Sequence, residues 1–259
     1  METALTELLK TGDEEREKRG LVYTPSEISG QVDLWKTTLE RFENRLDDIR
    51  PFIKRALKKR APIICTGAGT SEFIGYCVEG LLRKNLRVPV NVFSTTKIVT
   101  SPFDCFIEGS NALLISFARS GNSPESIGAV EIADMVSDRI QHLIITCNKD
   151  GNLKKRAAGK QNSLVFCLDE GTDDRGLAMT SSFSNMVIAA QMLSYIFNFS
   201  DYSGLFGDIV IAGRNILLKA PDVVKKISGL KFDRAVFLGN GGNFGTAGFF
   251  VTALRHSNR

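Results

Sequence analysis

The residues best suited to chemistry in this chain are serines, threonines and glycines gathered in three short stretches. The first stretch is Gly67-Ala68-Gly69-Thr70-Ser71, the second runs from residue 119 to residue 126, and the third runs from residue 175 to residue 182. Hydroxyl and backbone N–H groups donate hydrogen bonds, and an arginine adds a fixed positive charge. A phosphate group is the ligand that suits such donors best. The sequence therefore predicts an anion site built by three loops.

The candidate phosphate ligands are the glycine, hydroxyl, amide and guanidinium groups of these stretches. They are Gly69, Thr70, Ser71, Arg119, Ser120, Asn122, Ser123, Thr180 and Ser181. The loops lack the lysine of a nucleotide-binding P-loop, and Glu72 and Phe73 stand where a dinucleotide-binding motif would have its third glycine. For any single loop, ordinary helix-capping and turn chemistry is an equally good interpretation. The occurrence of three such loops favours the phosphate site.

Histidine and cysteine chemistry is poorly supported. His142 and His256 have neither the spacing of a zinc site nor that of a catalytic triad, so we expect no metal and no cofactor. The chain has 5 cysteines and no Cys-x-x-Cys pair, and several of them end apolar runs. Buried free thiols in a reducing cytosol are the expected state.

The composition is that of a soluble globular protein, with 259 residues, 43% hydrophobic and 24% charged, and a net charge of +4. A basic cluster lies between Lys54 and Arg60, but no aromatic residues alternate with it, so a solvated helix face is expected rather than a nucleic-acid site. No apolar run approaches the roughly 20 residues of a membrane span. The acidic N-terminus shows no signal peptide. We therefore expect a cytoplasmic protein without nucleic-acid or membrane partners.

Strand-like runs alternate with helical runs in the middle of the chain. Strands are predicted at 62–66, 90–93, 112–116, 142–146 and 163–167, and helices at 71–83, 124–136 and near Leu153. This alternation predicts an α/β fold with a five-stranded parallel sheet flanked by helices. Ligands of such sheets bind outside the carboxyl ends of the strands, which is where the three loops would lie.

The flanking segments are predicted to be helical. A helix with a capping box is expected to start at Thr24–Glu27, followed by helical patterning over 33–59, 180–197 and 206–227. A strand over 235–238 then leads into a glycine turn that resembles the turn at 67–71, which suggests an internal repeat. The expected organisation is an N-terminal helical segment (1–45), a first sheet domain (46–215) and the truncated start of a second one (216–259).

Four segments together resemble a known family: GAGTS (67–71), SFARSGNSPES (116–126), TCNKDG (146–151) and DRGLAMTSSFS (174–184). With Glu27-Ile28, Gln31 and Trp35, they are similar to the sugar isomerase (SIS) superfamily, and within it to the tagatose-6-phosphate ketose/aldose isomerase or galactosamine-6-phosphate deaminase family. The resemblance covers about residues 23–247. It implies tandem flavodoxin-like SIS domains in a homo-oligomer, with a dimer as our expectation, and a hexose or hexosamine phosphate as the ligand.

The resemblance also implies roles for residues and a reaction. Ser71, Ser120, Ser123 and either Thr180 or Ser181 would hold the phosphate, with Arg119 and Asn122 as further members of the same motif. The implied reaction opens the ring of an amino-sugar phosphate, moves a proton between C1 and C2, and releases ammonia to give a ketose phosphate.

The chain departs from the family at the position of the catalytic glutamate. Phe249 stands there, and Gly248 to Thr252 replaces the helix that carries the glutamate in the family. A shifted reading frame or a premature stop after Ala247 would explain a C-terminal truncation. The acidic residues near the loops are expected to serve helix starts and turns, so no catalytic residue is assigned; they are Glu72, Glu125, Asp173 and Asp174.

Three interpretations of function remain open at this point. The chain could be an isomerase and deaminase, a non-catalytic module that binds a phosphosugar, or a fragment that folds poorly and exposes the apolar residues 249–251.

Overall fold

Five parallel strands form one sheet at the centre of the molecule, in the order β2-β1-β3-β4-β5. The structure is a computed structural model that describes the backbone of residues 2–257 and the side chains of residues 2–252. The strands are β1 (Ile63–Gly67), β2 (Val90–Ser94), β3 (Ala112–Ala118), β4 (Ile140–Thr146) and β5 (Ser163–Cys167). The predicted α/β class with a five-stranded parallel sheet is confirmed.

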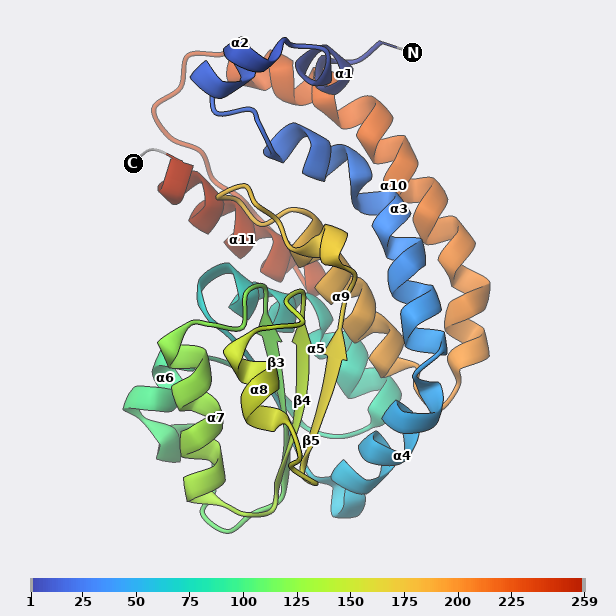
Figure 1. Ribbon diagram of the computed structural model, residues 1–259, viewed down its shortest axis with the longest axis vertical. Coiled ribbons are helices and arrows are strands. Elements are labelled where there is room, and N and C mark those ends of the chain that lie inside the picture. Colours follow the sequence, from blue (N-terminus) through green and yellow to red (C-terminus); the bar gives the residue numbers. More distant parts are fainter. Residues whose placement is uncertain (1, 258–259) are drawn as a thin grey trace.

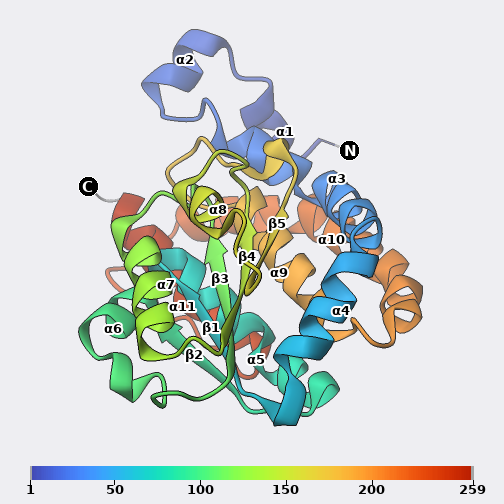
Figure 2. The same cartoon turned by 60° about the horizontal axis from the view of Figure 1, so that its bottom comes forward.

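Helices cover both faces of the sheet (Figures 1 and 2). One face carries α5 (Glu72–Leu86) and α9 (Ser181–Ser194), and the other carries α6 (Thr95–Thr100), α7 (Pro124–Val136) and α8 (Asn152–Ala157). Successive side chains of a strand point to opposite faces of the sheet, so neighbouring strand residues belong to different apolar clusters. Short 3-10 turns lie at Lys58–Arg60, Gly69–Ser71, Pro102–Asp104 and Glu170–Thr172.

A second layer of helices packs outside α9. α3 (Thr24–Glu43) packs on α9, and α1 (Ala4–Leu9) and α10 (Phe199–Ser228) pack on α3. α4 (Leu46–Ala56) follows α3 in the chain, and α2 (Asp13–Lys18) buries no side chain and projects from the molecule in Figure 2. The long helices α3 and α10 run side by side in Figure 1. They approach closely at Gly213, where an added Cβ would lie 2.4 Å from the Trp35 ring.

The helical pattern predicted over 33–59 is divided in the structure. α3 ends at Glu43 and α4 begins at Leu46, which lets the chain turn onto the sheet. The expected boundary at 45/46 coincides with this break, whereas the expected boundary at 215/216 lies inside α10. The division into domains remains a prediction.

The strand predicted over 235–238 does not form. These residues have no regular structure, and Val236 and Leu238 are 81% and 89% exposed. A parallel strand needs a neighbouring strand to receive its backbone hydrogen bonds, and none of the described strands lies beside this segment. The segment leads instead directly into α11 (Gly242–Ser257), which packs against α5. Among the described residues, no helix combines the length and the apolar character that a membrane crossing requires.

Candidate functional site

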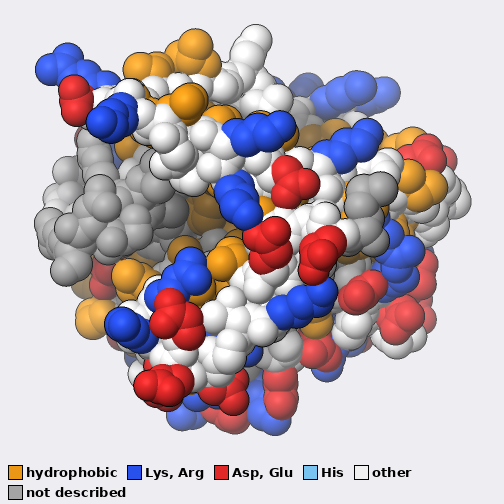
Figure 3. All heavy atoms as spheres, turned by 90° about the horizontal axis from the view of Figure 1, so that it is seen from above, with side chains coloured by type: hydrophobic (Ala, Val, Ile, Leu, Met, Phe, Trp, Pro, Cys, Tyr) orange, Lys and Arg blue, Asp and Glu red, His pale blue; other side chains and the backbone are white. Residues whose placement is uncertain are grey.

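A cavity of about 610 Å³ opens at the edge of the sheet where the strands end. Figure 3 looks onto this side of the molecule, where Lys and Arg side chains border a hollow with hydrophobic side chains inside it. The predicted ligands that line the cavity are Gly69, Thr70, Ser71, Arg119, Ser120 and Ser123. Asn122, Thr180 and Ser181 do not line it.

The first wall is the turn from β1 into α5. Gly67 has no room for a side chain, because a Cβ would lie 2.5 Å from the backbone carbon of Ser71. Gly69 takes a positive φ of 56°, which glycine adopts without steric cost. This tight turn places the Thr70 and Ser71 hydroxyls at the N-terminal end of α5, where the helix dipole favours an anion.

The second wall is the turn from β3 into α7. Gly121 has a positive φ of 64° and brings Ser120 and Ser123 to the cavity. Ser120 Oγ accepts a hydrogen bond from the Asn122 N–H at 3.3 Å, and its own proton remains available to a ligand. Ser123 is the N-cap of α7 but makes no side-chain cap bond, and its Oγ lies 2.6 Å from Ser126 Oγ.

Asn122 serves the neighbouring loop instead of the cavity. Its Oδ1 accepts the N–H of Asn152 at 3.0 Å, at the first residue of α8. Gly151 packs against this loop so tightly that a Cβ would lie 2.6 Å from the Ser120 carbonyl oxygen. The segment 146–151 therefore packs against and supports the loop of residues 119–123.

The third predicted loop is held by an internal carboxylate. Asp174 accepts hydrogen bonds from the N–H groups of Thr180, Ser181 and Ser182 at 2.8–3.0 Å. It also accepts the Thr180 hydroxyl at 2.9 Å, while the Ser181 hydroxyl donates to the Glu27 carbonyl oxygen. Because Asp174 accepts the N–H groups of residues 180–182 at the positive end of α9, these three groups are not available to a phosphate.

Glu27 holds the loop that begins at Arg175. Its Oε1 accepts the backbone N–H groups of Arg175 and Gly176 at 2.7 and 3.0 Å. The predicted capping box is therefore wrong: the N-cap of α3 is Tyr23, without a side-chain cap bond, and Glu27 binds another loop. No local pattern indicates this contact, because the partners lie 148 residues apart.

The structure adds lining residues that were not among the candidate phosphate ligands. Gly20, Leu21, Tyr23 and Thr24 from the N-terminal segment line the cavity on one side, and residues 175–179 line it on another. The Thr70 hydroxyl donates to Met179 Sδ at 2.6 Å, and Ser71 Oγ lies 3.7 Å from the same sulfur. Met179 also borders a second, largely apolar cavity of about 840 Å³.

Phe249, at the position where the family's glutamate was expected, belongs to that second cavity. Its ring centroid lies 4.2 Å from that of Phe183, and both side chains line the apolar cavity. Within the described part of the chain, no Asp, Glu, His or Lys lines the cavity with the phosphate loops.

Titration shifts near the cavity follow from burial. Burial raises the pKa of the Asp173 carboxyl, and the guanidinium of Arg119 counteracts this rise. Burial also raises the pKa of the Cys147 thiol to about 12, so this cysteine is an inert core residue.

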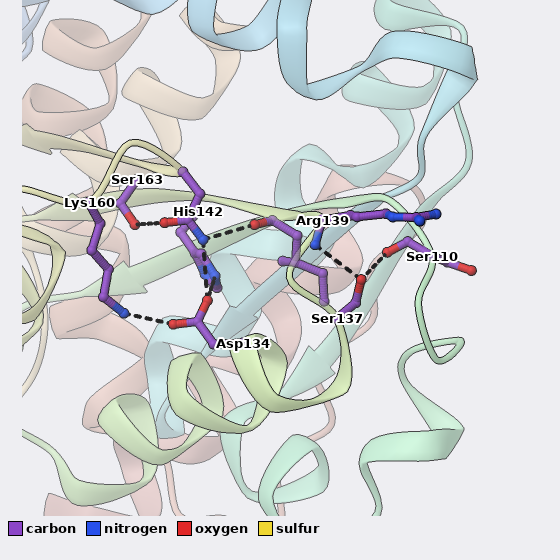
Figure 4. Close-up of polar contacts among 9 residues, drawn as sticks. Ser110, Asp134, Ser137, Arg139, His142, Lys160 and Ser163 are labelled. Atoms are coloured by element: carbon purple, nitrogen blue, oxygen red, sulfur yellow. Dashed lines mark hydrogen bonds and ion pairs between the residues drawn. The ribbon is translucent and has the colours of Figure 1, made fainter.

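A more strongly perturbed carboxyl lies away from the cavity, at the opposite edge of the sheet (Figure 4). Asp134 on α7 accepts a hydrogen bond from Nε2 of the fully buried His142 on β4 at 2.8 Å. Lys160 lies 2.7 Å from its other oxygen. These partners lower the pKa of Asp134 well below its usual range, the hydrogen bond from His142 contributing most. The cluster joins a helix to the sheet and does not contact the cavity.

Comparisons with known proteins agree with the fold. No family model matches the chain. It is 36% identical to the D-galactosamine-6-phosphate deaminase AgaS of Escherichia coli over 227 residues, which are 87% of this chain and 59% of that protein. The crystal structure of tagatose-6-phosphate ketose/aldose isomerase from Escherichia coli matches with a TM-score of 0.79 at 34% identity, over 87% of this chain and 61% of that one.

A protein from Clostridium novyi NT, provisionally described as a tagatose-6-phosphate ketose/aldose isomerase, matches with a TM-score of 0.87 at 36% identity. That match covers 93% of this chain and 62% of the other. The chain thus spans about three fifths of the length of these relatives, at 59–62%. The chain therefore belongs to the sugar isomerase superfamily, and within it to the family of tagatose-6-phosphate ketose/aldose isomerases and galactosamine-6-phosphate deaminases.

Proposed function

We propose that this chain binds a hexose or hexosamine 6-phosphate and acts in the aldose–ketose isomerisation and deamination of galactosamine-6-phosphate. The observation that carries the proposal is the convergence of two glycine–serine turns and the N-termini of α5 and α7 on one cavity. Ser71, Ser120 and Ser123 supply hydroxyl donors there, and the helix ends favour an anion. The names of the relatives supply the substrate class.

The reaction that we propose opens the sugar ring, moves a proton between C1 and C2, and releases ammonia from the amino sugar. A phosphate group held by the turns would fix one end of the substrate and orient the other. Such positioning is the contribution that the described residues can make to this chemistry.

A second candidate function is binding of the phosphosugar without turnover. It is favoured by the composition of the cavity, in which no carboxylate, imidazole or amine is present among the described lining residues. A positioned general base contributes about 10²–10⁴ to the rate, so its absence from the cavity favours a binding protein.

A double variant tests the phosphate assignment. We expect Ser120→Ala with Ser123→Ala to weaken galactosamine-6-phosphate binding about 10-fold or more in calorimetry, since each lost hydroxyl donor to a charged group is worth about 1.5–3 kcal/mol. Ser203→Ala on the exposed face of α10 is the matched control and should bind as the wild type does. Unchanged binding in the double variant would contradict the assignment.

Turnover separates the two candidate functions. The purified chain is incubated with galactosamine-6-phosphate and with tagatose-6-phosphate, and ammonia and sugar products are measured. Ammonia release that is abolished in the double variant supports the isomerase and deaminase. Saturable binding without any product assigns the chain to the second function.

We also propose that the protein is cytoplasmic and forms a homo-oligomer, with a dimer as the unit. The free thiols support a reducing compartment; they are Cys65, Cys77, Cys105, Cys147 and Cys167. Apolar residues exposed on α10 support self-association.

A further inference from the structure

Among the described residues, the arginines that line the cavity are Arg119 and Arg175, and the structure gives them different surroundings. Arg119 Nη1 donates a hydrogen bond to the Gly176 carbonyl oxygen at 3.1 Å. Burial raises the pKa of the Asp173 carboxyl and of the Cys147 thiol, and the positive charge of Arg119 counteracts both rises. Arg119 is therefore engaged in holding the loop that follows Asp174.

Arg175 stacks on an aromatic ring. Its guanidinium carbon lies 4.6 Å from the centroid of the Tyr23 ring, and both residues are exposed at the cavity. Among the described residues, no Asp or Glu forms an ion pair with it. A guanidinium that rests with its face on an aromatic ring keeps its N–H edge available for oxygen acceptors.

The backbone beneath Arg175 is fixed although its side chain is exposed. Glu27 accepts the N–H groups of Arg175 and Gly176, and Arg119 donates to the carbonyl of Gly176. Gly176 is also confined, since a Cβ there would lie 2.6 Å from Thr24 Oγ1 and 2.7 Å from Glu27 Oε2. The N-terminal segment thus anchors the loop from which Arg175 reaches over the cavity.

We propose that Arg175, supported by Tyr23, is the residue that neutralises the phosphate of the bound sugar, and that Arg119 is a positioning residue for the loop. The inference rests on the proposed phosphosugar site and assigns its charged partner. The family motif draws attention to Arg119, whereas the contacts assign the free cation to residue 175. In this proposal the N-terminal segment contributes Tyr23 to the substrate site.

Calorimetric titration with galactosamine-6-phosphate and with inorganic phosphate tests the proposal. Arg175→Gln is expected to weaken binding of both ligands about 10–100-fold, as for the loss of a hydrogen-bonded charge pair. Arg175→Lys, which keeps the charge but not the planar fork, should lose less. The affinity of Arg175→Gln should also depend less on salt concentration than that of the wild type.

Melting temperatures separate the roles of the two arginines. Arg175→Gln should melt at the wild-type temperature because its side chain is exposed, whereas Arg119→Gln should melt lower because the loop loses an anchor. Tyr23→Phe keeps the ring and is the matched control for Tyr23→Ala, which should weaken binding. If the wild type binds and Arg175→Gln binds equally well, the inference is overturned while the proposed site stands. If the wild type binds neither ligand, the proposed function itself fails.

Discussion

The carboxyl of Asp134 on α7 joins this helix to β4 and to the segment before β5 through hydrogen bonds. It receives hydrogen bonds from His142 on β4 and from Lys160 and Asn162 in the segment before β5. Because these groups stabilise the charged carboxylate, its pKa is lowered relative to the unfolded chain, the contribution of His142 being the largest. A depressed carboxyl pKa stabilises the folded state above the unfolded pKa of about 4, and this contribution is lost as the pH falls below that value.

Asp134→Asn should therefore destabilise the protein in a pH-dependent manner. At pH 7 we expect the free energy of unfolding to fall by about 2 kcal/mol, since hydrogen bonds to a charged group are lost. The difference from the wild type should shrink as the pH falls below about 4, because the Asp134 carboxyl of the unfolded wild-type chain then binds a proton that the folded state does not. Urea unfolding at several pH values measures both.

Asp138→Asn is the matched control, because Asp138 is exposed and lies just beyond the end of α7. A constant difference between Asp134→Asn and the wild type across the acid range would show that the charge of Asp134 does not stabilise the fold.

Individual site residues could be predicted from the sequence only in part. Ser71, Ser120 and Ser123 lie together because each follows a parallel strand, and the carboxyl ends of such strands meet at one edge. Asn122 and Thr180 come from the same motifs, but their polar groups bond to Asn152 and Asp174. The local sequence identifies side chains that can form hydrogen bonds, but it does not show which partner each of them binds.

The N-terminal end of α9 is held by one carboxylate. Asp174 is 6% exposed and accepts the first N–H groups of the helix, together with the hydroxyls of Thr180 and Ser182. Helix ends leave several N–H groups without a partner inside the helix, and a carboxylate at this end also interacts favourably with the helix dipole. α9 packs against α3 and α5, so the capping residue supports much of the core.

Asp174→Ala should lower the free energy of unfolding by about 2 kcal/mol, since an N-cap and buried hydrogen bonds are lost together. Asp173→Ala removes the neighbouring carboxyl, which accepts none of these bonds, and is the matched control. Denaturation in urea, followed by circular dichroism, measures both variants. Equal stability of the two would contradict the capping role of Asp174.

Among the elements, the strands and α7 follow the sequence closely, because buried parallel strands are short apolar runs between turn residues. The start of α3 was mispredicted, since a glutamate three residues after a threonine can bind a distant loop instead of its own helix. The segment 235–238 has the composition of a strand but no neighbour to pair with. Pairing depends on the rest of the fold, which a local pattern does not contain.

At the scale of the whole molecule, α10 exposes a row of apolar side chains. Leu205, Ile216, Val223 and Ile227 are 48–62% exposed. Their spacing approximates multiples of the 3.6-residue helical turn, so they share one face of the helix, beside the face that packs on α3. Exposed apolar side chains along one helix face suit an interaction site. A second copy of the chain could bury the same face in a symmetric dimer.

We therefore expect the protein to sediment as a dimer at micromolar concentration. The double variant Ile216→Glu with Val223→Glu should sediment as a monomer, because the dimer interface would bury two carboxylates without partners. Asn215→Glu places the same charge on an exposed position of α10 outside this row, and should leave the dimer intact. Binding of galactosamine-6-phosphate should persist in the monomeric variant, since the described lining of the cavity includes no residue of α10. A monomeric wild type at all concentrations would contradict the assignment of this face to self-association.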